Sequence, residues 1–247
     1  MLLNDPPPSA GDLHFSLLGI PVRVHPMFWV IGLVLGMTGG AEESLWPILV
    51  WVIAVFLSVL VHEMGHALVI RALGVQPWIT LYGMGGLTNH QGGRFRPATQ
   101  ILVSFAGPAA GFLLAALIIV LVVSTGHDFR IRWGWPYLVV WLIGGFSKPG
   151  VEELCNDLLF VNIWWGILNL LPIFPLDGGR ITNEVLNITY PRGALRVTLW
   201  ISLVVATAMA ATGLTSHPVQ LFRVLLFGSL AYSNFQLLGL AAGGRRW

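Results

Sequence analysis

The amino-acid sequence predicts an all-α polytopic membrane protein with about six transmembrane helices and a small β-hairpin or sheet at the membrane. Three observations support this class: 55% of the 247 residues are hydrophobic, 10% are charged, and the mean hydropathy is +0.77. Soluble domains carry roughly 25% charged residues, so this chain lacks the side chains needed to cover a surface that faces water. We therefore expect a single membrane-embedded domain over residues 1–247, with the lipid bilayer as its solvent.

Charge and cysteine content exclude several other classes. The formal net charge is +2 and no basic cluster stands out, so we expect no nucleic-acid partner. Cys155 is the only cysteine, which rules out an intramolecular disulfide and a zinc knuckle built from cysteine and histidine.

The chain divides into a tail, a hairpin and a series of apolar stretches. Residues 1–13 combine acids and prolines, unlike a signal peptide, and we expect a disordered tail. A hairpin around a Gly-Ile-Pro turn is predicted for residues 13–26, LHFSLLGIPVRVHP. Because a helix needs about 20 apolar residues to cross a bilayer, we expect spans at about 26–40, 45–71, 98–124, 154–176, 195–213 and 219–241. Residues 133–146 are apolar but too short, and we interpret them as interfacial or re-entrant.

The distribution of basic residues predicts the orientation. With six spans and the N-terminus inside, nine of the 13 basic residues lie inside and four outside, which agrees with the positive-inside rule. We therefore expect a multi-pass protein of the cell (inner) membrane with both termini in the cytoplasm. Counting 133–146 as a full span would invert the later segments and move Arg180, Arg192 and Arg196 outside.

The HEMGH motif at residues 62–66 places polar groups inside the second predicted span. On a helix, His62 and His66 share one face, so both imidazoles can bind one zinc ion while Glu63 lies beside it as a general base. The alternative is that these residues are packing or snorkelling groups near a helix end. An unpaired carboxylate within a span costs several kcal/mol, however, and a metal site that uses all three residues avoids that cost.

Asp177 is our candidate for the third zinc ligand. It lies in NLLPIFPLDGGR, where Pro172 and Pro175 interrupt the helix and the following glycines allow the backbone to turn. Irregular backbone at membrane depth must be buried in protein or line a wet cavity. The second and fourth spans run in the same direction, which predicts a site within the membrane but nearer the cytoplasm. The alternative is a glycine-capped helix end with an interfacial aspartate.

With both motifs in place, the chain resembles the site-2 proteases, which are intramembrane zinc metalloproteases of peptidase family M50. The resemblance rests on HEMGH at 62–66, NLLPIFPLDGG at 169–179 and the small-residue run SFAGPAAG at 104–111 between them, and it covers about residues 15–240. It implies one Zn²⁺ per chain held by His62, His66 and Asp177, with Glu63 as the catalytic base. It also implies that Asn169 hydrogen-bonds near the scissile peptide or the oxyanion, although an asparagine that joins two helices is an equal alternative.

The expected reaction is hydrolysis of a peptide bond within or near a transmembrane helix of a membrane-protein substrate. Glu63 would take a proton from the attacking water and deliver it to the leaving amine. Because helical hydrogen bonds shield the peptide, the substrate must unwind locally. VQPWITLYGMGGLTNH at 75–90 predicts a hairpin whose free edge could pair with an extended substrate, or else an ordinary surface hairpin.

Two other classes of function remain as alternatives: a metal-binding membrane protein or transporter without peptidase activity, and a scaffold that binds transmembrane helices. A transporter has no need of Glu63 directly after a zinc ligand. We expect no PDZ-like or CBS domain, either of which some site-2 proteases carry. The substrate, its regulation and the oligomeric state do not follow from the sequence.

Overall fold

The computed structural model describes residues 5–37, 45–83, 85–134, 137–143, 149–216 and 219–242. These residues form two sheets and seven helices: α1 (Pro26–Met37), α2 (Leu45–Ala72), α3 (Pro97–Ser124), α4 (Pro149–Asn169), α5 (Asp177–Thr189), α6 (Ala194–Thr215) and α7 (Leu221–Ala242). The chain separates into two compact units. The first comprises residues 1–93 and 106–167, and the second comprises 94–105 and 168–247.

Four of the described helices, α2, α3, α6 and α7, are long and apolar enough to cross a membrane. They match the predicted spans 45–71, 98–124, 195–213 and 219–241 to within about two residues. Their outward side chains are apolar as well: Leu113 on α3 and Phe235 on α7 are 70% and 62% exposed. This exposure suits contact with lipid, and it confirms a mostly helical, multi-pass membrane protein.

The other two predicted spans correspond to shorter or more polar helices. Helix α1 has 12 residues, and residues 38–40 of the expected span lie outside the described ones. Helix α4 begins at Pro149 and ends at Asn169, so it starts earlier and stops earlier than the expected 154–176. Its early end has a physical cause, because Pro172 and Pro175 cannot continue helical hydrogen bonding. For these two helices the crossing of the membrane stays a prediction.

The two predicted hairpins join into one four-stranded sheet in the order β1-β2-β3-β4. Strands β1 (Leu13–Leu17) and β2 (Ile20–Val24) pair antiparallel, as do β3 (Pro77–Tyr82) and β4 (Gly85–His90), while β2 and β3 pair in parallel. The turn of the first hairpin is Leu18-Gly19, both with positive φ, and not Gly-Ile-Pro, because Ile20 already pairs with Leu17. Strands β1 and β4 form the edges.

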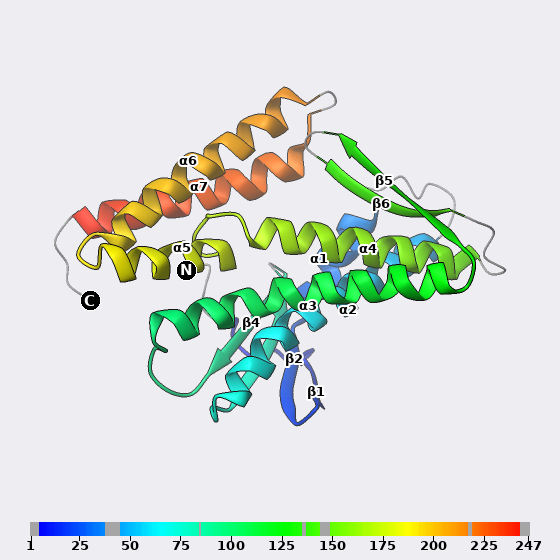
Figure 1. Cartoon of the computed structure of the whole chain (residues 1–247), viewed down its shortest axis with the longest axis horizontal. Coiled ribbons are helices and arrows are strands. Elements are labelled where there is room, and N and C mark those ends of the chain that lie inside the picture. The colour runs from blue at the N-terminus through cyan, green and yellow to red at the C-terminus, as the bar shows by residue number, and fades with distance from the viewer. Residues whose placement is uncertain are drawn as a thin grey trace. The chain divides into compact units, whose positions relative to one another are not determined.

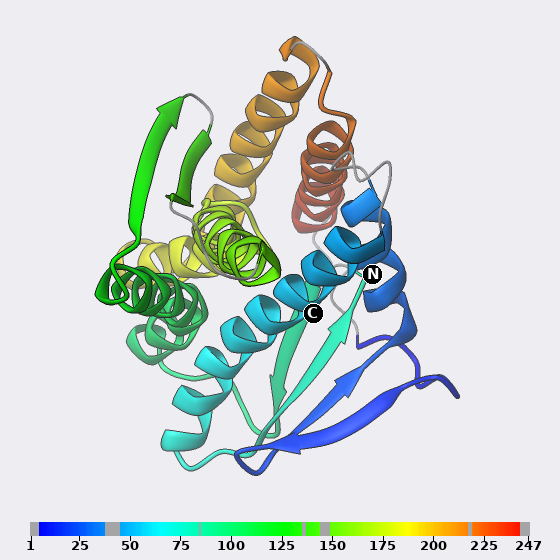
Figure 2. The same ribbon diagram turned by 90° about the vertical axis from the view of Figure 1, so that its right-hand side faces the viewer.

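One face of this sheet packs against α2 (Figure 2). Ile20, Val22 and Val24 of β2 alternate inward and join Ile79 and Leu81 of β3 in a buried cluster. The residues of α2 in this cluster are Val59, Leu60, Met64 and Ala67, two of which lie in or next to the HEMGH motif. The sheet therefore supports the motif from one side of the helix.

Residues 133–146, which we expected to be interfacial or re-entrant, fall mainly in a second hairpin (Figure 1). Strand β5 (Asp128–Gly134) pairs antiparallel with β6 (Tyr137–Ile143). Residues 135–136 and 144–146 lie outside the described ones. The location of this hairpin relative to a membrane stays a prediction.

The second compact unit is built around α5, α6 and α7. Helices α6 and α7 lie side by side in opposite directions (Figure 1). Ile173, in the segment between α4 and α5, is fully buried in a cluster with Ala206 of α6 and Phe227 and Leu230 of α7. Helix α5 was not predicted, since we expected Gly178 and Gly179 to let the backbone turn, whereas they lie in the first turn of this helix.

Candidate metal centre

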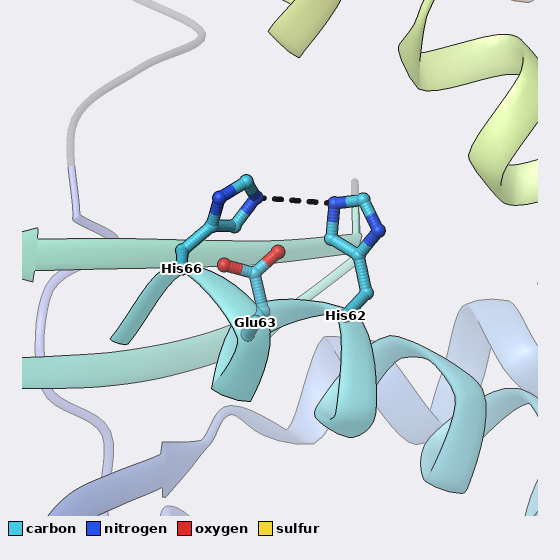
Figure 3. Close-up of side chains that lie close together, drawn as sticks. All are labelled: His62, Glu63 and His66. Atoms are coloured by element: carbon cyan, nitrogen blue, oxygen red, sulfur yellow. Dashed lines mark hydrogen bonds between the residues drawn. The ribbon is translucent and has the colours of Figure 1, made fainter. Parts of the chain in front are cut away.

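The HEMGH motif lies on one regular stretch of α2, as predicted. His62, Glu63 and His66 are 3%, 5% and 7% exposed, so all three are withdrawn from the surface of an apolar helix. Figure 3 shows the two imidazole rings facing each other with the Glu63 carboxylate beside them. One ligand atom from each residue can be chosen so that all lie within 4.8 Å of one another.

The separation of the imidazoles fits a metal ion. His62 Nε2 and His66 Nε2 lie 3.2 Å apart. Two nitrogens bound at about 2.0–2.1 Å to a tetrahedral zinc ion are about 3.3 Å apart. The spacing of four residues on an α-helix accounts for this geometry, because side chains at i and i+4 stand one above the other.

Glycines of α2 and α3 bring these two helices into contact at the motif. A Cβ added at Gly65 would lie 2.4 Å from the main-chain oxygen of Ala106, so α3 approaches α2 directly at that point. A Cβ at Gly107 would lie 2.3 Å from His66 Nε2 and 2.8 Å from His62 Nε2. Gly107 thus leaves open the space in front of both nitrogens, which is where an ion would bind. The run SFAGPAAG was noticed in the sequence, but its role beside the imidazoles was not.

The Glu63 carboxylate is held by strand β4. The Thr88 hydroxyl donates a hydrogen bond to Glu63 Oε2 at 2.7 Å, and it also lies 3.1 Å from the Glu63 main-chain oxygen. Gly86 packs on the same side chain: a Cβ there would lie 2.5 Å from Oε1. The sequence predicted the hairpin but not its contacts with Glu63. The one signal for them was that the hairpin follows the HEMGH motif closely along the chain.

A second polar contact lies one turn before His62 on α2. The Asn162 amide of α4 donates to Ser58 Oγ at 2.8 Å and to its own helix at the Leu158 carbonyl, also at 2.8 Å. Asn162 and Ser58 are 2% and 1% exposed. A hydrogen bond between two apolar helices at this depth fixes their relative rotation.

The second motif lies in the other compact unit, where both of its polar residues are buried. Asn169 is the last residue of α4 and Asp177 the first of α5, and they are 9% and 7% exposed. A carboxylate at a helix N-terminus is stabilised by the free N–H groups there. Asp177 is therefore a buried carboxylate at a helix N-terminus, and its part as a zinc ligand stays a prediction.

The segment between Asn169 and Asp177 is irregular, and side chains from other helices satisfy its backbone. The Phe174 N–H donates to Ser202 Oγ of α6 at 2.8 Å, and the Phe174 carbonyl accepts from Asn234 Nδ2 of α7 at 2.6 Å. Glycine is required at 178, since a Cβ there would lie 2.2 Å from the Leu170 carbonyl oxygen. Such pairing lets non-helical backbone persist in an apolar environment.

An ion pair anchors α5 further along. Arg94, ahead of α3, pairs with Glu184, whose side chain is 5% exposed. The amides of Asn183 and Asn187 lie 3.4 Å from the same carboxylate. Glu184 is therefore a compensated buried charge within the second unit.

The sequence model of peptidase family M50 matches residues 50–212, a range that contains both motifs. The zinc metalloprotease MJ0392 of Methanocaldococcus jannaschii is 29% identical over 216 residues, which cover 86% of this chain and 57% of that protein. Stage IV sporulation protein FB of Bacillus subtilis is 27% identical over 225 residues, which cover 88% of this chain and 66% of that protein. The chain thus spans less than two thirds of the length of either relative.

The fold is similar to that of a solved structure, the site-2 protease from Methanocaldococcus jannaschii. The TM-score is 0.59 at 24% sequence identity, and the match covers 92% of this chain and 95% of the solved one. Together with the family match, this confirms the resemblance that the two motifs indicated.

Proposed function

Since the chain belongs to peptidase family M50, we propose that it is a zinc metalloprotease that hydrolyses a peptide bond within or near a transmembrane helix of another membrane protein. The observation that carries this proposal is the buried pair His62 and His66, whose Nε2 atoms lie 3.2 Å apart, with the Glu63 carboxylate next to them on an apolar helix.

We assign the metal ligands to His62, His66 and Asp177. The donor set of two imidazoles and one carboxylate is typical of a catalytic zinc site, which keeps one position open. The burial of Asp177 and the irregular backbone before it support its selection as the third ligand. When bound, zinc at such a site lowers the pKa of a coordinated water to about 7 and polarises a carbonyl oxygen.

Glu63 acts as the general base in this proposal. Its carboxylate would accept a proton from the attacking water and pass it to the amine that leaves when the peptide bond breaks. Asn169 would donate its amide to the scissile peptide or to the oxygen that gains negative charge.

The substrate would be a transmembrane helix that unwinds before cleavage. Strand β4 is an edge of the first sheet, and in the described part of the chain it pairs on one side only. It also carries the residues that contact Glu63, so an extended segment added to this edge would lie close to the base. The excess of basic residues inside supports cytoplasmic termini and a site nearer the cytoplasmic face.

The decisive experiment is metal content per mole of purified protein, followed by cleavage. We expect about one zinc in the wild type and in Glu63→Gln, and little in His66→Ala and Asp177→Ala. His25→Ala serves as the matched control for loss of a histidine and should keep its zinc. Retention of zinc by Asp177→Ala would remove that residue from the ligand set.

Cleavage is then followed on tagged single-span membrane proteins co-expressed with each variant. A fragment that forms with the wild type and is absent with Glu63→Gln supports the protease. If Glu63→Gln keeps its zinc and also performs the function of the wild type in cells, the result would instead support a metal-binding protein or transporter.

A further inference from the structure

We propose that Thr88 is a positioning residue for the general base, which it holds by the hydrogen bond from its hydroxyl to the Glu63 carboxylate. This inference rests on the proposed function of Glu63. The contact is direct, because Thr88 Oγ1 lies 2.7 Å from Glu63 Oε2. A distance of 2.7 Å is typical of a hydrogen bond donated by a hydroxyl to an oxygen.

The carboxylate needs such a partner because of where it lies. Glu63 is 5% exposed, and a buried carboxylate without a hydrogen-bond donor is costly. The glutamate side chain is also long and would otherwise sample several rotamers. Thr88 holds one oxygen while Gly86 packs against the other, since a Cβ at Gly86 would lie 2.3–2.5 Å from Cγ, Cδ and Oε1. The two contacts together define one orientation of the carboxylate.

The strand register explains why these two residues reach Glu63. Gly86 and Thr88 are two positions apart and therefore point to the same face of the sheet. Their partners across β3 are Leu81 and Ile79, which belong to the core cluster that packs on α2. The face of the sheet that packs on α2 thus carries the Thr88 hydroxyl on its edge strand β4, where the hydroxyl reaches the Glu63 carboxylate.

The location of Thr88 on the edge strand connects the base to substrate binding. An extended substrate that pairs with β4 would be hydrogen-bonded to the main chain of the strand whose side chain orients Glu63. Strand β4 would then position both Glu63 and the substrate. This matters because catalytic groups must be held within about 0.5 Å of productive geometry. Truncating the hydroxyl leaves the strand's backbone groups in place, so turnover should suffer and not binding.

The test compares Thr88→Val, which keeps the shape and loses the hydroxyl, with Thr88→Ser, which keeps the hydroxyl. Thr80→Val is the matched control: Thr80 lies on neighbouring β3, is fully buried, and its hydroxyl has no hydrogen-bond partner in the described part of the chain. It pairs with Leu87 and so faces away from α2. The probe is a tagged single-span protein that the wild type cleaves and Glu63→Gln does not.

We expect Thr88→Val to lower kcat about 10–100-fold, the usual loss when a residue supporting a metal-site group is removed. KM and the zinc content should stay near wild type, Thr88→Ser should recover most of the rate, and Thr80→Val should leave it unchanged. If Thr88→Val cleaves normally while Glu63→Gln is inactive, the inference on Thr88 is wrong and the proposed function stands. If the wild type and Glu63→Gln cleave the tagged single-span proteins equally, the proposed function is at fault instead.

A second measurement does not depend on activity. In metal-free protein, Thr88→Val should lower the melting temperature more when Glu63 is present than in a Glu63→Leu background, where the main-chain oxygen of residue 63 remains as an acceptor but the carboxylate does not. The same decrease in both backgrounds would assign Thr88 a general structural role and overturn the proposal. Should Thr88→Val fail to fold, Thr88→Ala replaces it in both measurements.

Discussion

The HEMGH stretch of α2 and the segment from Asn169 to Asp177 both bury polar side chains in an apolar protein, but different forces hold them. In α2, the regular helix alone sets the two imidazoles 3.2 Å apart. In the second segment the backbone leaves the helix, and its orientation depends on side chains of α6 and α7, which bond to Phe174. The first geometry is local, whereas the second is assembled from residues 28 and 60 positions away.

This difference indicates how substitutions should act in the two regions. A change beside α2 should alter metal binding while leaving the fold intact, because the helix does not depend on the metal for its hydrogen bonds. A change that removes a partner of the irregular segment should destabilise the backbone first, since a buried peptide group then loses a hydrogen bond from another helix. Three substitutions test whether the two regions differ in this way.

Gly107→Ala should have the largest effect on the metal. The new Cβ would lie 2.3 Å from His66 Nε2, so it would occupy the space in front of the imidazoles or push them apart. We expect zinc affinity to fall about tenfold or more, with helix content unchanged. Gly111→Ala, one turn further along α3, is the control, because its Cβ would contact Asn162 Oδ1 at 3.3 Å and not an imidazole. Full zinc content in Gly107→Ala would show that the ion does not bind there.

Asn234→Leu should act on stability. It removes the amide that donates to the Phe174 carbonyl at 2.6 Å, and a buried carbonyl without a partner costs about 1–3 kcal/mol. We expect a lower melting temperature in detergent. Ser233→Ala is the control, because the Ser233 hydroxyl bonds within α7 to the Ser229 carbonyl. Equal melting temperatures for the two variants would contradict the role given to Asn234.

Arg94→Gln should have the smallest effect. Its partner Glu184 is buried, but the Arg94 side chain is 61% exposed, so water screens the pair and its loss costs about 0.5–1 kcal/mol. The decrease in melting temperature should shrink at high salt. Arg192→Gln, at an exposed position, should not change the melting temperature. An effect as large as that of Asn234→Leu would mean that Arg94 supplies most of the stabilisation of the buried Glu184 charge.

Much of the fold followed from patterns that need no tertiary information. Apolar length predicted α2, α3, α6 and α7 to within about two residues, because a bilayer sets the minimum length of a helix that crosses it. Alternation around LYGMGGL predicted β3 and β4. Pro172 and Pro175 predicted that a helix stops before Asp177. Helix α5 was missed because its first residues, Asp-Gly-Gly, are typical of a helix end and not of a start. Close packing of the two glycines on the backbone of Leu170, Leu171, Ile173 and Phe174 overrides that preference.

By itself, the sequence determined the membrane class and the pairing of His62 with His66, since hydropathy and the helical period are properties of consecutive residues. The surroundings of the motif depend on tertiary contacts: the parallel pairing of β2 with β3, the approach of Gly107 to the imidazoles, and the hydrogen bond from the Thr88 hydroxyl to Glu63. These contacts join residues 25 to 57 positions apart. No local pattern encodes such contacts, because they depend on which faces of helices and strands become buried together.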